Sequence, residues 1–210
     1  MDPAGEHSGR HRGRRWWFVA AIAWVAAVGT GFSILWRHEG TPGALLAPPV
    51  HWPRNSLVAL APDRLTLVTF AHPNCPCTHA TLAELGRLVA QCRERFVATV
   101  VFCTDPELGD GWQRAANPEQ AAHIPGVLLR ADPLGATTRV FGARTSGFTV
   151  VYSPSGALLY HGGITGSRGH EGDNPGAAAV RDLALTGALS LPSGAVYGCE
   201  LFAAAEGGDR

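Results

Sequence analysis

LTLVTFAHPNCPCTHATLAEL, residues 65–85, combines a strand pattern, a two-cysteine motif and the start of a helix pattern. Residues 65–70 are apolar or β-branched and predict a buried strand. From residue 78 to residue 96, apolar side chains recur at steps of three and four, which predicts an amphipathic helix. Cys75, Pro76 and Cys77 lie between these elements, so we expect the motif at a strand-to-helix junction.

Strand and helix patterns alternate along residues 63–190. Residues 97–102 are mostly apolar, as expected of a strand buried on both faces. Further along the chain we expect helix 111–122, strand 127–129, helix 133–141, strands 148–152 and 157–161, and helix 175–189 capped by Asn174. The turn residues Ser-Pro-Ser-Gly at 153–156 join the last two strands in a hairpin. This order predicts an α/β fold in which helices flank a mixed sheet.

The Cys-Pro-Cys motif predicts reactive thiols. A strand-to-helix junction brings free backbone N–H groups and the positive end of the helix dipole next to a thiol, which favours the thiolate. Cys75 and Cys77 are separated by one residue, so a disulfide between them would close a small, strained ring of the labile kind. The structural alternative is an inert pair or a permanent staple, although so short a loop contributes little stability.

The N-terminal region predicts a membrane anchor. Residues 16–36 are 21 consecutive residues without a charge, enough for a helix to span roughly 30 Å of hydrocarbon. Trp16, Trp17 and Trp36 mark its ends, and arginines are concentrated before it, which favours a cytoplasmic N-terminus. A cleavable signal peptide is the alternative, but its apolar core is usually shorter. A buried soluble helix is a further alternative, which is disfavoured because the span is apolar on every face.

The expected organisation has five parts: a cytoplasmic tail at 1–15, the transmembrane anchor at 16–36, a Pro-rich linker at 37–62, the α/β domain at 63–190 and a C-terminal tail at 191–210. The 17 basic residues are all arginine and balance 17 acidic ones, so the net charge is 0. A generally basic nucleic-acid-binding protein is therefore excluded. With 46% hydrophobic residues, the chain is also unlike a disordered one.

The strand, Cys-Pro-Cys motif and helix, together with the later hairpin TVVYSPSGALLYHGG, resemble the thioredoxin fold over residues from about 60 to 190. The resemblance is strongest to the membrane-anchored thiol–disulfide oxidoreductases of the TlpA/ResA type. HPNCPCTHATLAEL and GGITGSRGHEGDNPG are also similar to the RedB-type proteins of bacteria. The resemblance implies a thioredoxin-like mixed sheet, a single-pass bacterial inner-membrane protein with a periplasmic domain, and extracytoplasmic protein thiols or disulfides as partners, with no cofactor.

The resemblance also implies roles for particular residues, with two departures from the family pattern. One residue separates the cysteines instead of two, so either Cys75 or Asn74 aligns with the usual nucleophile, and Cys77 aligns with the resolving cysteine. Gly147 stands where the family carries a cis-proline facing the site. His72 and His79 flank the motif, either lowering the thiol pKa or capping the turn.

Copper binding is the main alternative. Two thiolates and an imidazole suit Cu(I), and copper chaperones of the Sco type resemble this chain in fold and topology. Cys75 and Cys77 would then be ligands, with His72 and His79 as further candidates beside the motif. His161 or His170 would supply the distal histidine. A third interpretation is a docking or assembly factor that has lost its redox role.

Three cysteines lie outside the motif. Cys92 is on the apolar helix face and Cys103 ends a strand, so both are expected to be packed thiols, or else paired with each other. Cys199 becomes a third redox thiol or a metal ligand if the C-terminal tail folds back over the site. The glycine-rich segment 162–176 is expected to form a polar loop beside the active-site face, either docking a partner or remaining an ordinary surface loop.

Overall fold

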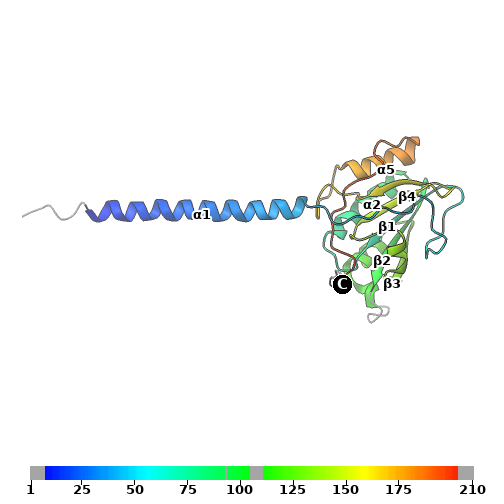
Figure 1. Cartoon of the computed structure of the whole chain (residues 1–210), viewed down its shortest axis with the longest axis horizontal. Coiled ribbons are helices and arrows are strands. Elements are labelled where there is room, and N and C mark those ends of the chain that lie inside the picture. Colours follow the sequence, from blue (N-terminus) through cyan, green and yellow to red (C-terminus); the bar gives the residue numbers. More distant parts are fainter. Residues whose placement is uncertain (1–7, 93, 105–110, 203–210) are drawn as a thin grey trace, which may run out of the picture. The chain divides into compact units, whose positions relative to one another are not determined.

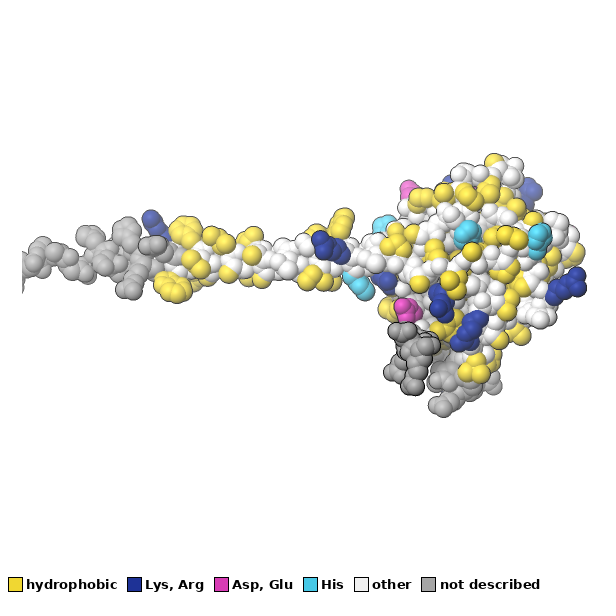
Figure 2. All heavy atoms as spheres, viewed as in Figure 1, with side chains coloured by type: hydrophobic (Ala, Val, Ile, Leu, Met, Phe, Trp, Pro, Cys, Tyr) yellow, Lys and Arg dark blue, Asp and Glu magenta, His cyan; other side chains and the backbone are white. Residues whose placement is uncertain are grey.

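The computed structural model describes residues 8–92, 94–104 and 111–202. The chain separates into two compact units, Met1–Gly40 and Thr41–Arg210. In the first unit, helix α1 (Ser8–Gly40) includes an apolar span, Trp16–Gly40, with a mean hydropathy of 2.0 and no buried residues. Figure 2 shows its hydrophobic side chains distributed along the helix. By length and composition, this helix is a candidate single-pass membrane anchor.

A five-stranded mixed sheet forms the centre of the second unit (Figure 1). The strand order is β3-β2-β1-β4-β5, in which β1, β2 and β3 are parallel while β4 runs antiparallel to both β1 and β5. The strands are β1 (Leu65–Ala71), β2 (Phe96–Thr104), β3 (Val127–Pro133), β4 (Phe148–Tyr152) and β5 (Leu158–Gly162). The helices of this unit are α2 (Thr78–Cys92), α3 (Ala116–Ala122), α4 (Ala136–Val140) and α5 (Pro175–Thr186).

Apolar side chains cover both faces of the sheet because successive residues of a strand point to opposite faces. In β1, Leu67 belongs to the core cluster formed with α2 and α5, and Val68 belongs to the opposite cluster beside α4. Both side chains are completely buried. A strand buried on both faces accounts for the nearly continuous apolar run in the sequence.

The predicted order of elements is confirmed, whereas several boundaries differ. The helix predicted at 78–96 ends at Cys92, because Phe96 pairs with Leu65 and begins β2. The helix predicted at 133–141 is shorter, because Pro133 is the last residue of β3. Pro175 begins α5 as expected, and the Asn174 side chain accepts a hydrogen bond from the Ala177 amide at 2.7 Å.

The segments on either side of the predicted domain pack against it. Residues 41–62 were expected to form a spacer, yet Trp52 packs edge-on against Phe141 and Tyr152, with ring centroids 5.2 and 5.1 Å apart. On the C-terminal side, Val196 and Leu201 are buried in the same cluster. The described parts of both segments therefore belong to the folded unit, because their apolar side chains complete this face of the core.

The alternative pairing of Cys92 with Cys103 is wrong. Both are free thiols, and they belong to the core clusters on opposite faces of the sheet. The alternation of β2 directs Cys103 away from α2, which carries Cys92. Both side chains are buried, as expected of packed thiols.

Candidate functional site

The loop from β1 to α2 holds Cys75 in a tightly hydrogen-bonded turn. The Cys75 amide donates to the carbonyl of His72 at 3.3 Å, and the Thr78 amide donates to the carbonyl of Cys75 at 3.1 Å. The buried Asn117, in α3, donates through Nδ2 to the carbonyls of both His72 and Cys75, at 3.1 and 2.8 Å. Helix α3 therefore fixes the position of Cys75 relative to the start of α2.

The residues preceding β4 form the second wall of the site. Ser146 Oγ accepts a hydrogen bond from the His72 amide at 2.8 Å and lies 2.6 Å from Thr78 Oγ1. The Gly147 amide donates to the carbonyl of Phe70 at 2.8 Å. Gly147 has a φ of +93°, a backbone conformation that residues with a Cβ rarely adopt. A glycine is thus well suited to this position, which the family resemblance assigned to proline.

The C-terminal segment, residues 196–201, brings a third cysteine to the site. The Ser146 amide donates to the carbonyl of Cys199, and the Leu201 amide donates to the carbonyl of Arg144, both at 2.8 Å. These bonds flank an isolated antiparallel bridge between Thr145 and Glu200. As a result, the sulfur of Cys199 lies 2.9 Å from the sulfur of Cys75. The Cys199 amide also donates a hydrogen bond to the Cys75 sulfur at 3.4 Å.

The surroundings favour ionisation of Cys75 over the other two thiols. Burial opposes ionisation, but hydrogen bonds from the side chains and amides of Cys199 and Thr78 outweigh it, so the pKa of Cys75 is lowered. Burial, followed by the negative charge of Cys75, raises the pKa of Cys77. Burial and the contact with Cys75 raise the pKa of Cys199 to about 12. Of these three thiols, Cys75 is therefore the one that ionises most readily.

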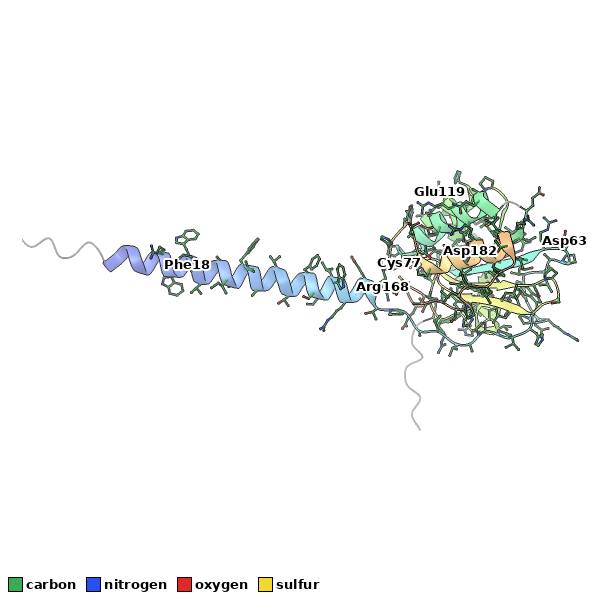
Figure 3. The ribbon with its side chains drawn as sticks, turned by 90° about the horizontal axis from the view of Figure 1, so that it is seen from above. Phe18, Asp63, Cys77, Glu119, Arg168 and Asp182 are labelled. Carbon is green, nitrogen blue, oxygen red and sulfur yellow. The ribbon has the colours of Figure 1, made fainter. Side chains whose placement is uncertain are left out.

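The glycine-rich segment 162–176 lies beside these sulfurs. Arg168 donates hydrogen bonds to the Cys77 side chain and, through Nη1, to the carbonyl of Gly198. Figure 3 labels Cys77 and Arg168, which lie close together in that view. Glu171, in the same segment, accepts from Arg87 Nη2 at 2.7 Å and lies 3.7 Å from His79 Nδ1. The segment thus links the site to helix α2.

The two histidines flanking the motif have different surroundings. His72 is partly buried, and its Nδ1 accepts a hydrogen bond from the Asn74 amide at 3.1 Å, so it caps the turn. Burial lowers its pKa, which favours the neutral ring. His79 is exposed, with 64% of its side chain accessible. Pro76 is also exposed between the two cysteines.

The copper ligand set is not assembled in the described part of the chain. Within residues 8–92, 94–104 and 111–202, no three His, Cys, Asp or Glu side chains are grouped so that they could hold a metal ion. His161 lies in β5 and His170 lies on the surface of the glycine-rich segment. Neither histidine therefore completes a site with Cys75 and Cys77 in this conformation.

Four residues that contact the site were not identified as such from the sequence: Thr78, Asn117, Ser146 and Arg168. Thr78 directly follows the motif, and a hydroxyl at the start of a helix is a recognisable signal. Asn117 and Ser146 are far from the motif in sequence and reach it only through the sheet topology. No local pattern distinguishes them.

Comparison with known proteins shows the fold. No protein-family model matches the chain, and a search of the curated proteins finds no match. A hypothetical protein from Sinorhizobium meliloti superposes with a TM-score of 0.55 and 19% identity, covering 77% of this chain and 93% of its own. An uncharacterised protein from Geobacillus kaustophilus also gives 0.55, with 18% identity and coverage of 78% and 89%.

A thiol–disulfide oxidoreductase from Bacteroides fragilis is more distant, with a TM-score of 0.39, 17% identity and coverage of 70% of this chain and 96% of its own. The topology, with its cysteine turn between β1 and α2 and its antiparallel β4–β5 pair, is thioredoxin-like. The chain is therefore a thioredoxin-fold protein with a candidate membrane helix at its N-terminus.

Proposed function

We propose that this protein is a membrane-anchored thiol–disulfide oxidoreductase of the TlpA/ResA type, facing the periplasm of a bacterium and acting on extracytoplasmic proteins. The observation that carries the proposal is the Cys75 sulfur, which is hydrogen-bonded at the start of α2 and lies 2.9 Å from a second sulfur. A stabilised thiolate next to another thiol is the arrangement that disulfide exchange needs. The narrower RedB-type resemblance remains a prediction.

In this mechanism the Cys75 thiolate attacks a disulfide of the substrate protein and forms a mixed disulfide. A second cysteine then attacks the Cys75 sulfur and releases the substrate as a thiol. The family resemblance assigns this second step to Cys77, with Cys199 as a third thiol. The arginines that precede residue 16 support the topology, because positive charge is retained on the cytoplasmic side.

Catalysed reduction of insulin by dithiothreitol tests the proposal with the full chain in detergent micelles. We expect the protein to accelerate the reaction, Cys75→Ser to abolish the acceleration and Cys92→Ala to retain it. Cys92→Ala is a matched control, because this thiol is buried in the core away from the site. Equal acceleration by the Cys75→Ser variant would contradict the proposal.

Native mass spectrometry of the same protein, isolated from copper-replete medium, tests the alternative. A copper adduct that disappears in the Cys77→Ser variant would favour a Sco-like copper(I) chaperone. Full function of both Cys75→Ser and Cys77→Ser in a deletion strain would instead favour a docking factor.

A further inference from the structure

The C-terminal segment, residues 196–201, covers the proposed nucleophile. Cys75 is only 1% exposed, although it lies in the loop between β1 and α2 and its neighbours Asn74 and Pro76 are exposed. The segment runs directly over the site, with Gly198 so close to Ser146 that a Cβ there would collide with the Ser146 carbonyl. The side chain of Cys199, the next residue in the segment, therefore packs against the Cys75 sulfur.

The backbone of this segment is hydrogen-bonded at both ends and near Cys199. The Val196 carbonyl accepts from the Gly43 amide, and the backbone bonds to Ser146 and Arg144 hold Cys199 and Leu201. The side chains of Val196 and Leu201 are buried, and Arg168 contacts the Gly198 carbonyl. Segments outside the central sheet open at a lower free-energy cost than a central strand. Because Cys75 is buried beneath this segment, reaction with a protein substrate requires local opening here.

We propose that Cys199 is the resolving thiol for Cys75, so that the oxidised protein carries a Cys75–Cys199 disulfide. This inference rests on the proposed function and names the residue that completes its second step. The two sulfurs are 2.9 Å apart and come from positions 124 residues apart, so their pairing does not require the strained ring that a Cys75–Cys77 bond would close.

The reaction balances in two exchanges. The Cys75 thiolate attacks a protein disulfide, forming a Cys75–substrate bond and releasing the first substrate thiolate, which takes a proton from water. Cys199 then forms a bond to the Cys75 sulfur, the Cys75–substrate bond breaks, and the proton of Cys199 passes to the second leaving thiolate. The substrate disulfide gains two electrons, and Cys75 with Cys199 loses them. The reverse sequence oxidises a substrate dithiol.

The electrostatics explain why Cys199 reacts second. Burial, the hydrogen bond to Cys75 and the negative charge of Cys75 all raise the pKa of the Cys199 thiol, which favours its protonated form. When Cys75 enters a mixed disulfide its charge is removed, and so is that part of the pKa elevation. Cys199 therefore becomes more nucleophilic only after Cys75 has been consumed. Arg168, whose positive charge favours the Cys199 thiolate, lies beside it.

Disulfide mapping tests this assignment with the reduced full chain in detergent micelles. The protein is mixed with one equivalent of oxidised glutathione, quenched with N-ethylmaleimide and digested with trypsin. Cleavage after arginine leaves Cys75 and Cys77 together on peptide 65–87 and Cys199 on peptide 182–210. We expect a disulfide to link these two peptides. Fragmentation of the peptide bond before Pro76 separates Cys75 from Cys77, and we expect the linked peptide on Cys75 and N-ethylmaleimide on Cys77.

Matched serine variants distinguish the two candidate resolving thiols. We expect Cys199→Ser to accumulate the glutathione adduct on Cys75, with release of the second glutathione slowed at least tenfold. Cys77→Ser should slow this release much less than Cys199→Ser does, and Cys92→Ala, whose thiol is buried in the core away from the site, is the control that should keep the parental rate. The reverse pattern would overturn the inference and leave the proposed function intact, with Cys77 as the resolving thiol. If native Cys75 forms no adduct while the unfolded chain does, the proposed function fails as well.

Discussion

The Cys75 sulfur accepts hydrogen bonds from Thr78, at the start of α2, and from Cys199, in the C-terminal segment. The Thr78 hydroxyl also lies 2.6 Å from Ser146 Oγ. Each hydrogen bond to the thiolate stabilises the charged form and lowers the pKa of Cys75. The reactivity of this sulfur therefore depends on individual neighbours that can be removed one at a time.

Thr78→Val removes one of these donors while keeping the shape of the side chain. Because a lowered pKa lets the thiolate form at lower pH, the alkylation rate of Cys75 should rise at a lower pH than that of an ordinary thiol. In Thr78→Val the rise should move to higher pH, and the rate at pH 7 should fall about tenfold, the equivalent of one charged hydrogen bond. The measurement is iodoacetamide alkylation against pH, read by peptide mass spectrometry.

Thr81→Val serves as the control because Thr81 is also buried in α2 but does not contribute to the pKa of Cys75. Its pH profile should match that of the parent. Identical profiles for Thr78→Val and the parent would show that the hydroxyl does not stabilise the thiolate.

Gly147→Ala should destabilise the protein through both backbone strain and crowding. At a φ of +93° an alanine is strained, and its Cβ would lie 2.9 Å from Thr81 Oγ1. The expected loss is about 2 kcal/mol in the free energy of unfolding. Gly126→Ala is the matched control, because Gly126 has a φ of +81° and open space around it, so only the strain remains. Urea denaturation compares the two, and equal losses would contradict the crowding.

At the residue scale, the sequence identified the two-cysteine turn between strand and helix but not the residues that contact it. Cys75 and Cys77 stand out because two cysteines between a strand pattern and a helix pattern form a local signal. Ser146 and Asn117 reach the turn from 74 and 45 residues away, measured from His72. Such contacts depend on how the strands are ordered in the sheet, which no local pattern encodes.

Helix α3 acts as a clamp by holding the cysteine turn in place through the side chain of Asn117. Asn117→Ala would remove the two side-chain hydrogen bonds to the carbonyls of His72 and Cys75, each of which would keep only its backbone donor. The expected cost is about 2 kcal/mol, which lowers Tm by roughly 4–8 °C in a domain of this size. Differential scanning calorimetry measures the change. Asn55→Ala, at an exposed position, should leave Tm nearly unchanged, and a similar stability of both variants would contradict the clamp.

At the element scale, the sequence predicted the order of strands and helices and the hairpin, because buried strands and amphipathic helices have distinct apolar periods. It was less successful at their ends. Phe96 fits the helical period of α2 and also the start of β2, and pairing with β1 selects the strand. The packing of residues 41–62 was missed because a Pro-rich composition hides the aromatic contacts of Trp52.

The whole chain joins an apolar helix to a thioredoxin-like unit. Deleting residues 1–40 should move the protein from the membrane to the soluble fraction, because these residues contain the span Trp16–Gly40. Carbonate extraction of membranes followed by immunoblotting measures the change.

Protease added to spheroplasts should digest the full-length domain, as the proposed periplasmic topology requires. A protected domain would contradict that topology, and a truncated chain that remained membrane-bound would show that residues 1–40 are not the main anchor.

The central claim is that Cys75 belongs to a reversible thiol–disulfide couple. The most direct test is equilibration of the full chain, in detergent micelles, across a series of glutathione redox buffers, followed by acid quenching and alkylation of each cysteine. We predict that Cys75 and one other thiol become protected together as a single two-electron transition, while Cys92 and Cys103 remain alkylated throughout once the quenched chain is unfolded. If Cys75 stays fully alkylated across the whole series, it forms no disulfide, and the protein is not a thiol–disulfide oxidoreductase.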